Sequence, residues 1–278
     1  MAAPALDRLR ARVTRLGAPL CIGIDPQPDA LPGPLSRDVH GVEAMARGLL
    51  EVAVEEAAAI KINIAFFEAF GSAGWAALER IRAEVPVELP VIIDAKRGDM
   101  ANTAKRYAAS IFGHLAADGT TLSPYLGADA IEPFTAYGDR IVYVLARTSN
   151  PTAGTFQDRT YGDRPLHEAV AEWVATTWRD PRVGLVVGAT APAELTRLRA
   201  LVPETPFLVP GVGAQGGDLA AAVRTCSGAH APGIVNVSRA IAGASDGADW
   251  QAAARRAARD HLERMREAAG ATLGASAP

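Results

Sequence analysis

Residues 91–100 read VIIDAKRGDM, an apolar run that passes directly into two acids and two bases. Residues 91–93 are apolar and β-branched, as expected of a strand covered on both faces in a parallel sheet. The charged residues that follow are Asp94, Lys96, Arg97 and Asp99. Charged side chains are seldom buried unless they are paired. A strand that ends in this way predicts a polar site at one edge of a sheet.

Seven further runs of this kind occur along the chain, separated by helical patterns. The eight predicted strands cover residues 19–24, 59–64, 90–94, 119–123, 141–146, 183–188, 206–210 and 233–238. The predicted helices cover residues 42–58, 66–84, 101–117, 128–137, 165–179, 192–201, 216–226 and 249–268. Eight strand–helix repeats are typical of an α/β fold of the (β/α)8, or TIM, barrel class. An open doubly wound sheet is the alternative, although it rarely needs eight units of such even length.

Composition indicates a globular protein of a single domain. The chain has 278 residues, 49% of them hydrophobic, and a net charge of -3. No linker divides it, so we expect residues 1–278 to form one barrel, with a tail after about residue 269 that is polar enough to fray. The charge balance does not favour nucleic acid or an anionic membrane as a partner. No apolar run approaches the roughly 18 residues of a membrane span.

The termini and the cysteines bear on the compartment. The first residues, MAAPALDRLRARV, carry charge throughout and lack the apolar core of a signal peptide. Cys21 and Cys226 are the only two cysteines, too few for a disulfide framework or a zinc site. We therefore expect a reduced, cytoplasmic protein.

In a TIM barrel the active site lies at the C-terminal ends of the strands. Asp94 and Lys96 are two apart on a strand, so they share a face, and Lys61 on the neighbouring strand can join them. An Asp–Lys pair about 4 Å apart gains roughly 4 kcal/mol at an effective dielectric of about 20, which favours the charged forms. A protonated lysine does not readily form a Schiff base, but it can donate a proton. An internal salt-bridge network without a catalytic role is the alternative.

Two loops after strands carry further signals. PGVGAQGG (210–217) contains G-x-G-x-x-G after a predicted strand, but no acid occurs between Leu219 and Ser245, where a dinucleotide site needs one. A phosphate clamp with Arg239 is the better interpretation, because loops after the seventh and eighth strands often bind phosphate in these barrels. TSNPTAGTFQDRTYGDR (148–164) is the longest connection, and long loops tend to be functional. No metal-ligand or cofactor motif is present.

DAKRGDMANT, from Asp94 through Lys96 and Asp99 to Thr103, resembles the D-x-K-x-x-D-x-x-x-T signature of the orotidine 5′-phosphate decarboxylase family, in particular its longer bacterial branch (type 2). Other segments that resemble the family, in the family's order, are GIDPQ (23–27), KINIAFFEAFG (61–71), SPYLG (123–127), TSNP (148–151), PGVGAQGG (210–217) and VNVSRAI (235–241). Each segment alone is a weak signal, but together they cover nearly the whole predicted barrel.

The resemblance implies a carboxy-lyase that converts orotidine 5′-phosphate to uridine 5′-monophosphate, the last step of de novo pyrimidine nucleotide synthesis, without a cofactor. It implies that Lys96 donates a proton to a C6 carbanion, with Lys61, Asp94 and Asp99 completing the catalytic array. It implies a homodimer in which Asp99 and Thr103 reach into the partner's site. The residues implied to bind substrate are Asp25 and Lys61 (ribose), Ser149 (pyrimidine), Gln215 and Arg239 (phosphate), Thr103, Pro210 and Ser238. Some relatives have Gly at the position of Ser238, where only a backbone N–H is needed.

Three other functions remain open at the level of sequence. A phosphosugar decarboxylase of the same superfamily also resembles D-x-K-x-x-D, but it binds Mg2+ with an acid where this chain has Lys61. A class I aldolase needs a neutral lysine. A non-catalytic nucleotide-binding barrel binds nucleotide without turnover.

Overall fold

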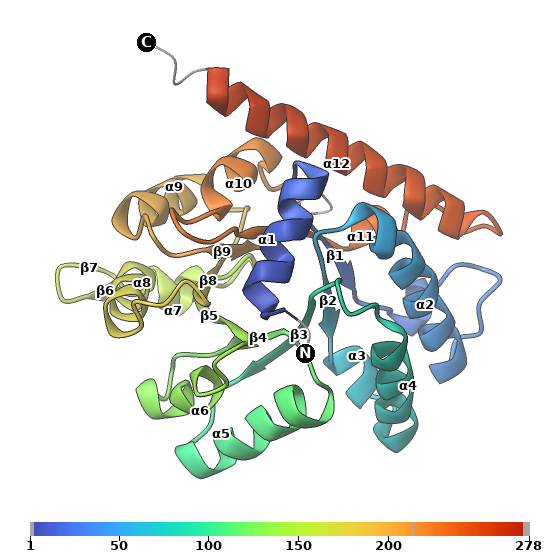
Figure 1. Cartoon of the computed structure of the whole chain (residues 1–278), viewed down its shortest axis with the longest axis horizontal. Helices are drawn as coiled ribbons and strands as arrows, with labels where there is room; N and C mark the ends of the chain where they lie inside the picture. The colour runs from blue at the N-terminus through green and yellow to red at the C-terminus, as the bar shows by residue number, and fades with distance from the viewer. Residues whose placement is uncertain (1–2, 214, 275–278) are drawn as a thin grey trace.

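Eight parallel strands close into a barrel in the computed structural model, which describes residues 3–213 and 215–274 (Figure 1). Around the barrel the order is β1-β10-β9-β8-β5-β4-β3-β2. The strands are β1 (Leu20–Ile24), β2 (Ala59–Asn63), β3 (Val91–Arg97), β4 (Gly119–Leu122), β5 (Ile141–Arg147), β8 (Val183–Val187), β9 (Phe207–Val209) and β10 (Ile234–Val237). The prediction of a (β/α)8 barrel is confirmed, and the open-sheet alternative is wrong.

The strands are buried on both faces, which explains their composition. Every residue of β1 (LCIGI) and of β8 (VGLVV) is buried. One face of each strand packs inside the barrel and the other against the surrounding helices, so apolar β-branched residues are favoured at successive positions. This is why uninterrupted apolar runs predict the strands well.

The helices surround the barrel, and Figure 1 shows them as an outer ring. The longer ones are α1 (Ala5–Leu16), α2 (Val39–Glu56), α4 (Gly71–Glu84), α5 (Ala101–Ala108), α8 (Leu166–Thr177), α9 (Pro192–Leu201), α10 (Leu219–Cys226) and α12 (Trp250–Gly274). The short ones are α3 (Ala65–Glu68), α6 (Glu132–Thr135), α7 (Gly154–Gln157) and α11 (Arg239–Ala242), with 3-10 turns at Pro28–Ala30 and Ala128–Ala130. Within the described residues, none of them has the length and apolar character needed to cross a membrane.

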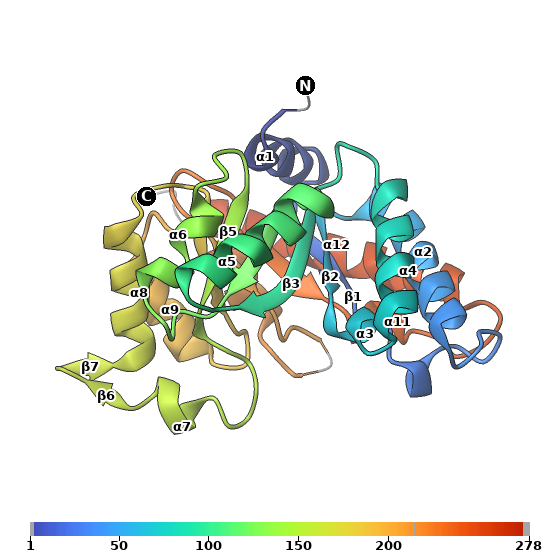
Figure 2. The same cartoon turned by 90° about the horizontal axis from the view of Figure 1, so that it is seen from below.

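Helix α1, which is not among the predicted elements, covers the end of the barrel where the strands begin. Figure 2 shows it opposite the end that carries α7 and the hairpin of β6 (Thr160–Tyr161) and β7 (Arg164–Pro165). Arg12 of α1 is buried and donates to the backbone oxygens of Ala53, Val54 and Ala57, at the end of α2. These bonds satisfy carbonyls that a helix terminus leaves free. Charged residues stand between the apolar positions of α1, so its sequence did not predict an amphipathic helix.

The structure shortens or divides five predicted helices, those at 66–84, 101–117, 128–137, 165–179 and 216–226. Gly71, the first residue of α4, has a φ of 59°, and this left-handed conformation breaks the helix between α3 and α4. Helix α5 passes into a π-helical turn at Ala109–His114. Asp218 caps α10 by accepting a bond from Ala221 N at 2.9 Å, so that helix starts after the glycines.

The last helix reaches beyond the expected start of the tail. Helix α12 ends at Gly274, after residue 269, because the alanines around Gly270 favour continued helix. The remainder of the expected tail, residues 275–278, lies outside the described residues.

Candidate active site

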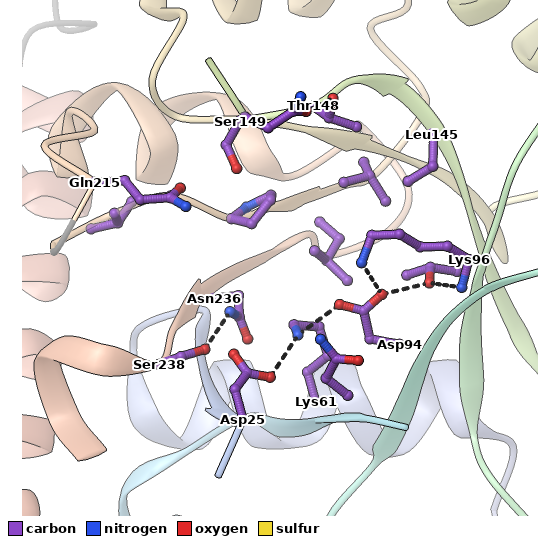
Figure 3. A pocket seen from close by; sticks show the side chains of 18 of the residues that line it. Asp25, Lys61, Asp94, Lys96, Leu145, Thr148, Ser149, Gln215, Asn236 and Ser238 are labelled. Carbon is purple, nitrogen blue, oxygen red and sulfur yellow. Dashed lines mark hydrogen bonds and ion pairs between the residues drawn. The ribbon is translucent and has the colours of Figure 1, made fainter. Parts of the chain in front are cut away.

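A cavity of about 470 Å3 opens at the C-terminal end of the barrel, a volume typical of small-molecule sites. Its two walls differ in chemistry, as Figure 3 shows in part. The β1–β3 side contributes Asp25, Lys61, Asp94 and Lys96, and the opposite side contributes Leu145, Val186, Leu208 and Pro210. Of the other residues predicted for the site, Ser149, Gln215, Ser238 and Arg239 also line the cavity.

The charged wall is a chain of alternating acids and bases. Lys61 Nζ lies 2.9 Å from Asp94 Oδ2 and 3.7 Å from Asp25 Oδ1. Lys96 Nζ lies 2.7 Å from Asp94 Oδ1. The side chains of Lys61 and Asp94 are 4% and 9% exposed, whereas that of Lys96 is 50% exposed. Lys61 and Asp94 are therefore buried and paired, whereas the Lys96 ammonium group is open to the cavity.

The pairing fixes the charge states of the buried members. Burial alone would lower the pKa of Lys61, but the charges of Asp25 and Asp94 outweigh it and raise that pKa above its usual value. Burial would raise the pKa of Asp94, but the charges of Lys61 and Lys96 outweigh it and hold that pKa well below its usual value. Lys61 is thus an ammonium and Asp94 a carboxylate at neutral pH.

A bulge in β3, rather than regular strand alternation, directs Lys96 into the cavity. Ile93 pairs with Thr120 and Arg97 with Leu122, so β3 spends two more residues than β4 over the same distance. Lys96 has a φ of 45°, an uncommon conformation for a residue with a side chain. Bulges of this kind re-aim side chains next to active sites. The predicted contact between Asp94 and Lys96 exists, but the reason given for it, regular alternation, is wrong.

Thr121 on β4 forms hydrogen bonds with both Lys96 and Asp94. Its Oγ1 accepts from Lys96 N at 3.0 Å and donates to Asp94 Oδ1 at 2.8 Å. Thr121 is buried, so both bonds are shielded from water. The sequence reasoning missed Thr121, although two threonines in the buried strand GTTL are a detectable signal.

The glycine-rich loop and Arg239 form the end of the cavity near β9 and β10. Gly211 and Gly213 have φ values of 96° and 83°, and a Cβ on Gly213 would lie 2.9 Å from that of Ala240. Arg239 is exposed and forms no ion pair with any residue in the described part of the chain. Backbone N–H groups beside an unpaired guanidinium suit an anion. Ala214, within the predicted clamp, lies outside the described residues.

The segment that follows β5 is held in place by contacts of Gln157, Asp158 and His167. The Gln157 side chain accepts from Thr148 N at 2.8 Å and lines the cavity. Asp158 forms a two-point ion pair with Arg147, at 2.8 and 3.0 Å. The buried His167 Nδ1 lies 2.8 Å from Gln157 O. The sequence reasoning treated this segment as a loop and did not identify Gln157, whose side chain bonds, among the described residues, only Thr148, nine residues earlier.

Two predicted residues lie apart from the cavity in this chain. Asp99 follows β3 and accepts a bond from Met100 N at 2.8 Å, and Thr103 is exposed on the first turn of α5. Neither belongs to the cavity lining found in the described residues. Arg97 points away from the cavity, where it pairs with Glu68 and lies 4.9 Å from the ring centre of Tyr107.

Comparison with known proteins accounts for this arrangement. Residues 18–257 match the family described as "Orotidine 5′-phosphate decarboxylase / HUMPS family". The chain belongs to this family. An orotidine 5′-phosphate decarboxylase from Roseiflexus castenholzii is 48% identical over 259 residues, which cover 92% of this chain and 93% of that protein.

Two solved structures extend the family likeness to three dimensions. The orotidine 5′-phosphate (OMP) decarboxylase of Leishmania donovani is 41% identical, with a TM-score of 0.81 over 95% of this chain and 99% of that one. The UMP synthase of the same organism is 42% identical, with a TM-score of 0.85 over 95% of this chain. The chain spans only 56% of that UMP synthase. The family resemblance noted in the sequence is thereby confirmed.

Proposed function

We propose that the protein is an orotidine 5′-phosphate decarboxylase, a carboxy-lyase that forms uridine 5′-monophosphate in pyrimidine synthesis. The observation that carries the proposal is the array Asp25–Lys61–Asp94–Lys96 facing an apolar wall in one cavity. The named relatives, 41% to 48% identical over most of the chain, support it.

The array suits a reaction that builds negative charge on carbon. When the bond from C6 to the carboxylate breaks, CO2 leaves and the electron pair remains on C6. The exposed ammonium of Lys96 stabilises that carbanion and then donates a proton to it, after which solvent restores the lysine. Fixed cations in a shielded site stabilise developing charge without reorganisation. Asp94 holds Lys96 at 2.7 Å, and the apolar wall provides a place from which CO2 can depart.

The proposal assigns each part of the substrate to residues of the cavity lining. Asp25 and Lys61 hold the ribose, Ser149 contacts the pyrimidine together with Pro210, and Gln215, Arg239 and the Ser238 backbone hold the phosphate. Contacts with the phosphate are distant from C6, so their binding energy can be realised in the transition state through loop closure.

The Mg-dependent phosphosugar decarboxylases are the second candidate. By resemblance they need an acid at the position of Lys61, and here that residue is a buried ammonium between two carboxylates. In the described residues no three His, Cys, Asp or Glu side chains are grouped in a way that could hold a metal ion. These two features favour the cofactor-free reaction.

We also propose a homodimer with shared active sites and a cytoplasmic location. Asp99 and Thr103 stand outside their own cavity, as the shared-site arrangement requires. The two cysteines are free and buried, which agrees with a reducing compartment.

The decisive experiment follows orotidine 5′-phosphate by its absorbance, with purified protein in excess EDTA. Full turnover is expected, because no step needs a divalent cation. Activity that disappears in EDTA and returns with Mg2+ would support the phosphosugar enzyme instead. Binding of nucleotide without any turnover would support a non-catalytic barrel, and trapping of a substrate adduct by borohydride would support an aldolase.

A further inference from the structure

His167 is a buried imidazole that takes no part in the proposed chemistry. It lies on the first turn of α8, is 3% exposed and is not part of the cavity lining found in the described residues. Its Nδ1 lies 2.8 Å from Gln157 O and 3.3 Å from Asp158 Oδ1. Carbonyl oxygens and ionised carboxylates only accept hydrogen bonds, so Nδ1 carries a hydrogen and donates it. These two acceptors determine the tautomer of His167.

The imidazole contributes a directed hydrogen bond rather than a countercharge. Each carboxylate beside it already has an arginine partner. Asp158 pairs with Arg147 at 2.8 Å, and Glu168 pairs with Arg197 at 2.8 Å. His167 Nε2 lies 4.0 Å from Glu168 Oε1 and has no hydrogen-bond partner among the described residues. The donation from Nδ1 is therefore the specific contact of this side chain.

Gln157 connects that contact to the cavity wall. Thr148 N donates to Gln157 Oε1 at 2.8 Å. Because a backbone N–H can only donate, this bond fixes which end of the amide is the oxygen. Gln157 Nε2 then donates to Thr148 Oγ1 at 2.8 Å, and the Thr148 hydroxyl donates to Asn150 Oδ1 at 2.6 Å. Residues 148–150 and 157 line the cavity, so the hydrogen bonds that begin at His167 end in its wall.

We propose that His167 is a positioning residue for this wall. Its Nδ1–H holds the backbone of Gln157, and the Gln157 amide holds Thr148 and the adjacent Ser149 (Figure 3). The inference rests on the proposed function, since Ser149 is the residue assigned there to the pyrimidine. His167 itself touches no substrate and acts through Gln157.

The test compares three substitutions at position 167. In His167→Asn the side-chain nitrogen takes the place of Nδ1, whereas in His167→Gln it takes the place of Nε2. His167→Leu and His167→Gln should raise KM for orotidine 5′-phosphate roughly 3- to 10-fold, the range expected for one hydrogen bond, with kcat within about twofold of the wild-type value. His167→Asn should keep KM within about twofold. Equal KM values for His167→Asn and His167→Gln overturn the proposal.

A cycle with Gln157→Ala tests the route through the amide. Gln157→Ala should itself raise KM, because Thr148 loses both of its bonds to that side chain. In this background His167→Leu should change KM by less than about twofold, since its connection to Thr148 is already broken. Effects of the two substitutions on KM that multiply fully would overturn the route through Gln157.

Glu168→Gln is the matched control. Glu168 is the next residue of α8 and is also buried, and the substitution breaks its ion pair with Arg197 while leaving the bond from His167 to Gln157 in place. Its unfolding temperature should fall while its KM stays at the wild-type value. A rise in KM as large as that of His167→Leu would mean that any loss of stability in α8 has this effect, and it would overturn the positioning role.

Amide hydrogen exchange over residues 148–157 of the free protein is a readout that needs no turnover. Exchange should increase in His167→Leu and stay near the wild-type rate in His167→Asn. If His167→Leu does not fold, His167→Gln replaces it in each comparison. Failure of the wild-type protein to turn over orotidine 5′-phosphate defeats the proposed function, whereas turnover with unchanged KM and unchanged exchange in these variants defeats only this inference.

Discussion

Lys96 adopts a backbone conformation that costs on the order of 1–3 kcal/mol for a residue with a side chain. The surrounding structure holds it there through the bond from Lys96 N to Thr121 Oγ1 and the ion pair with Asp94. Strain of this kind is kept where it positions a functional group. The bulge sets the Lys96 ammonium at the exposed end of the array, where it lines the cavity.

The first residue-scale prediction concerns Thr121→Val. This substitution keeps the shape of the side chain but removes the acceptor for Lys96 N and the donor to Asp94, so Lys96 loses its alignment. We expect kcat to fall roughly 10- to 100-fold, because small misplacements of a catalytic group are costly. Thr120→Val is the control, since Thr120 Oγ1 donates only to Ile93 O at 2.8 Å. Equal kcat values for the two variants would contradict the role of Thr121.

The second concerns Asp94→Asn and pH. The folded-state pKa of Asp94 is depressed. The Asp94 carboxylate therefore contributes to the free energy of unfolding above the unfolded pKa of about 3.9, and this contribution is lost as pH falls through the folded pKa. Removing the carboxylate leaves Lys61 poorly paired, which should lower the free energy of unfolding by about 3 kcal/mol at neutral pH. Denaturant unfolding should show this difference from about pH 5 to pH 8 and a smaller one below about pH 4.

Asp163→Asn is the control, because the Asp163 side chain is 84% exposed and pairs with the adjacent Arg164. Such exposed pairs contribute little to stability. If Asp94→Asn and the wild-type protein already had equal free energies of unfolding at pH 6, the result would be inconsistent with the depressed pKa of Asp94.

At this scale the sequence predicted the charged residues but not their supports. Asp25, Lys61, Asp94 and Lys96 follow apolar runs, so their placement at one barrel edge follows from the fold. Thr121 and Gln157 are polar residues whose side-chain partners lie elsewhere along the sequence, and the spacing of residues within one strand does not report those partners. The bulge at Lys96 is equally hidden, because the two extra residues of β3 leave no mark in its sequence pattern.

At the scale of elements, α7 and the β6–β7 hairpin make the segment after β5 an ordered part of the site. Arg147, at the end of β5, is 13% exposed and binds Asp158 through two hydrogen bonds. Gln157, the preceding residue, supports Thr148 and therefore Ser149 beside it. The position of Ser149, the proposed pyrimidine contact, thus depends on an ion pair outside the cavity.

The third prediction concerns the ion pair between Arg147 and Asp158. Asp158→Ala should raise KM several-fold and increase amide hydrogen exchange over residues 148–159, because the segment loses its anchor. Asp163→Ala, in the same segment but on the exposed hairpin, should change neither KM nor the exchange of these amides. Unchanged exchange in Asp158→Ala would show that other contacts hold the segment.

Strands were easier to predict than helices, for a physical reason. A strand buried on both faces must be apolar at successive positions, whereas a helix needs only one apolar stripe and tolerates interruption. Helix α1 was not predicted, because its charged residues suggest a solvated segment. In the structure two of them, Arg8 and Arg12, make internal contacts. Arg8 pairs with Asp118, which also accepts from Val91 N at 2.9 Å. These charges support the closed end of the barrel rather than a solvated surface.

For the whole molecule, we propose that the region after β3 and β4 contributes to the interface of the proposed homodimer. Met100, Tyr125 and Leu126 are 66%, 92% and 43% exposed, and they lie close in sequence to Asp99 or to the end of β4. Exposed large apolar side chains are suited to contact with another protein surface. A second copy related by two-fold symmetry is the simplest partner, and it would bring Asp99 and Thr103 to a neighbouring cavity.

The last prediction tests this shared site through two inactive variants. Lys96→Ala homodimers lack the proton donor in both sites, and Asp99→Ala homodimers lack the borrowed carboxylate in both. In a mixed dimer the Asp99→Ala subunit keeps Lys96, and its partner supplies an intact Asp99, so one site of two is complete. Random exchange makes half of the dimers mixed, so about a quarter of all sites should recover.

The measurement is turnover of orotidine 5′-phosphate after the two purified variants have exchanged subunits, with mixed dimers counted by native mass spectrometry. A mixture of Lys96→Ala with Asp94→Asn is the matched control. Asp94 lies 2.7 Å from Lys96 of its own chain, so neither site of that mixed dimer contains both side chains and no recovery is expected. Rescue in the first mixture alone requires that Asp99 act across the interface. Confirmed mixed dimers with no activity above the parent variants would mean that each Asp99 serves its own subunit or none.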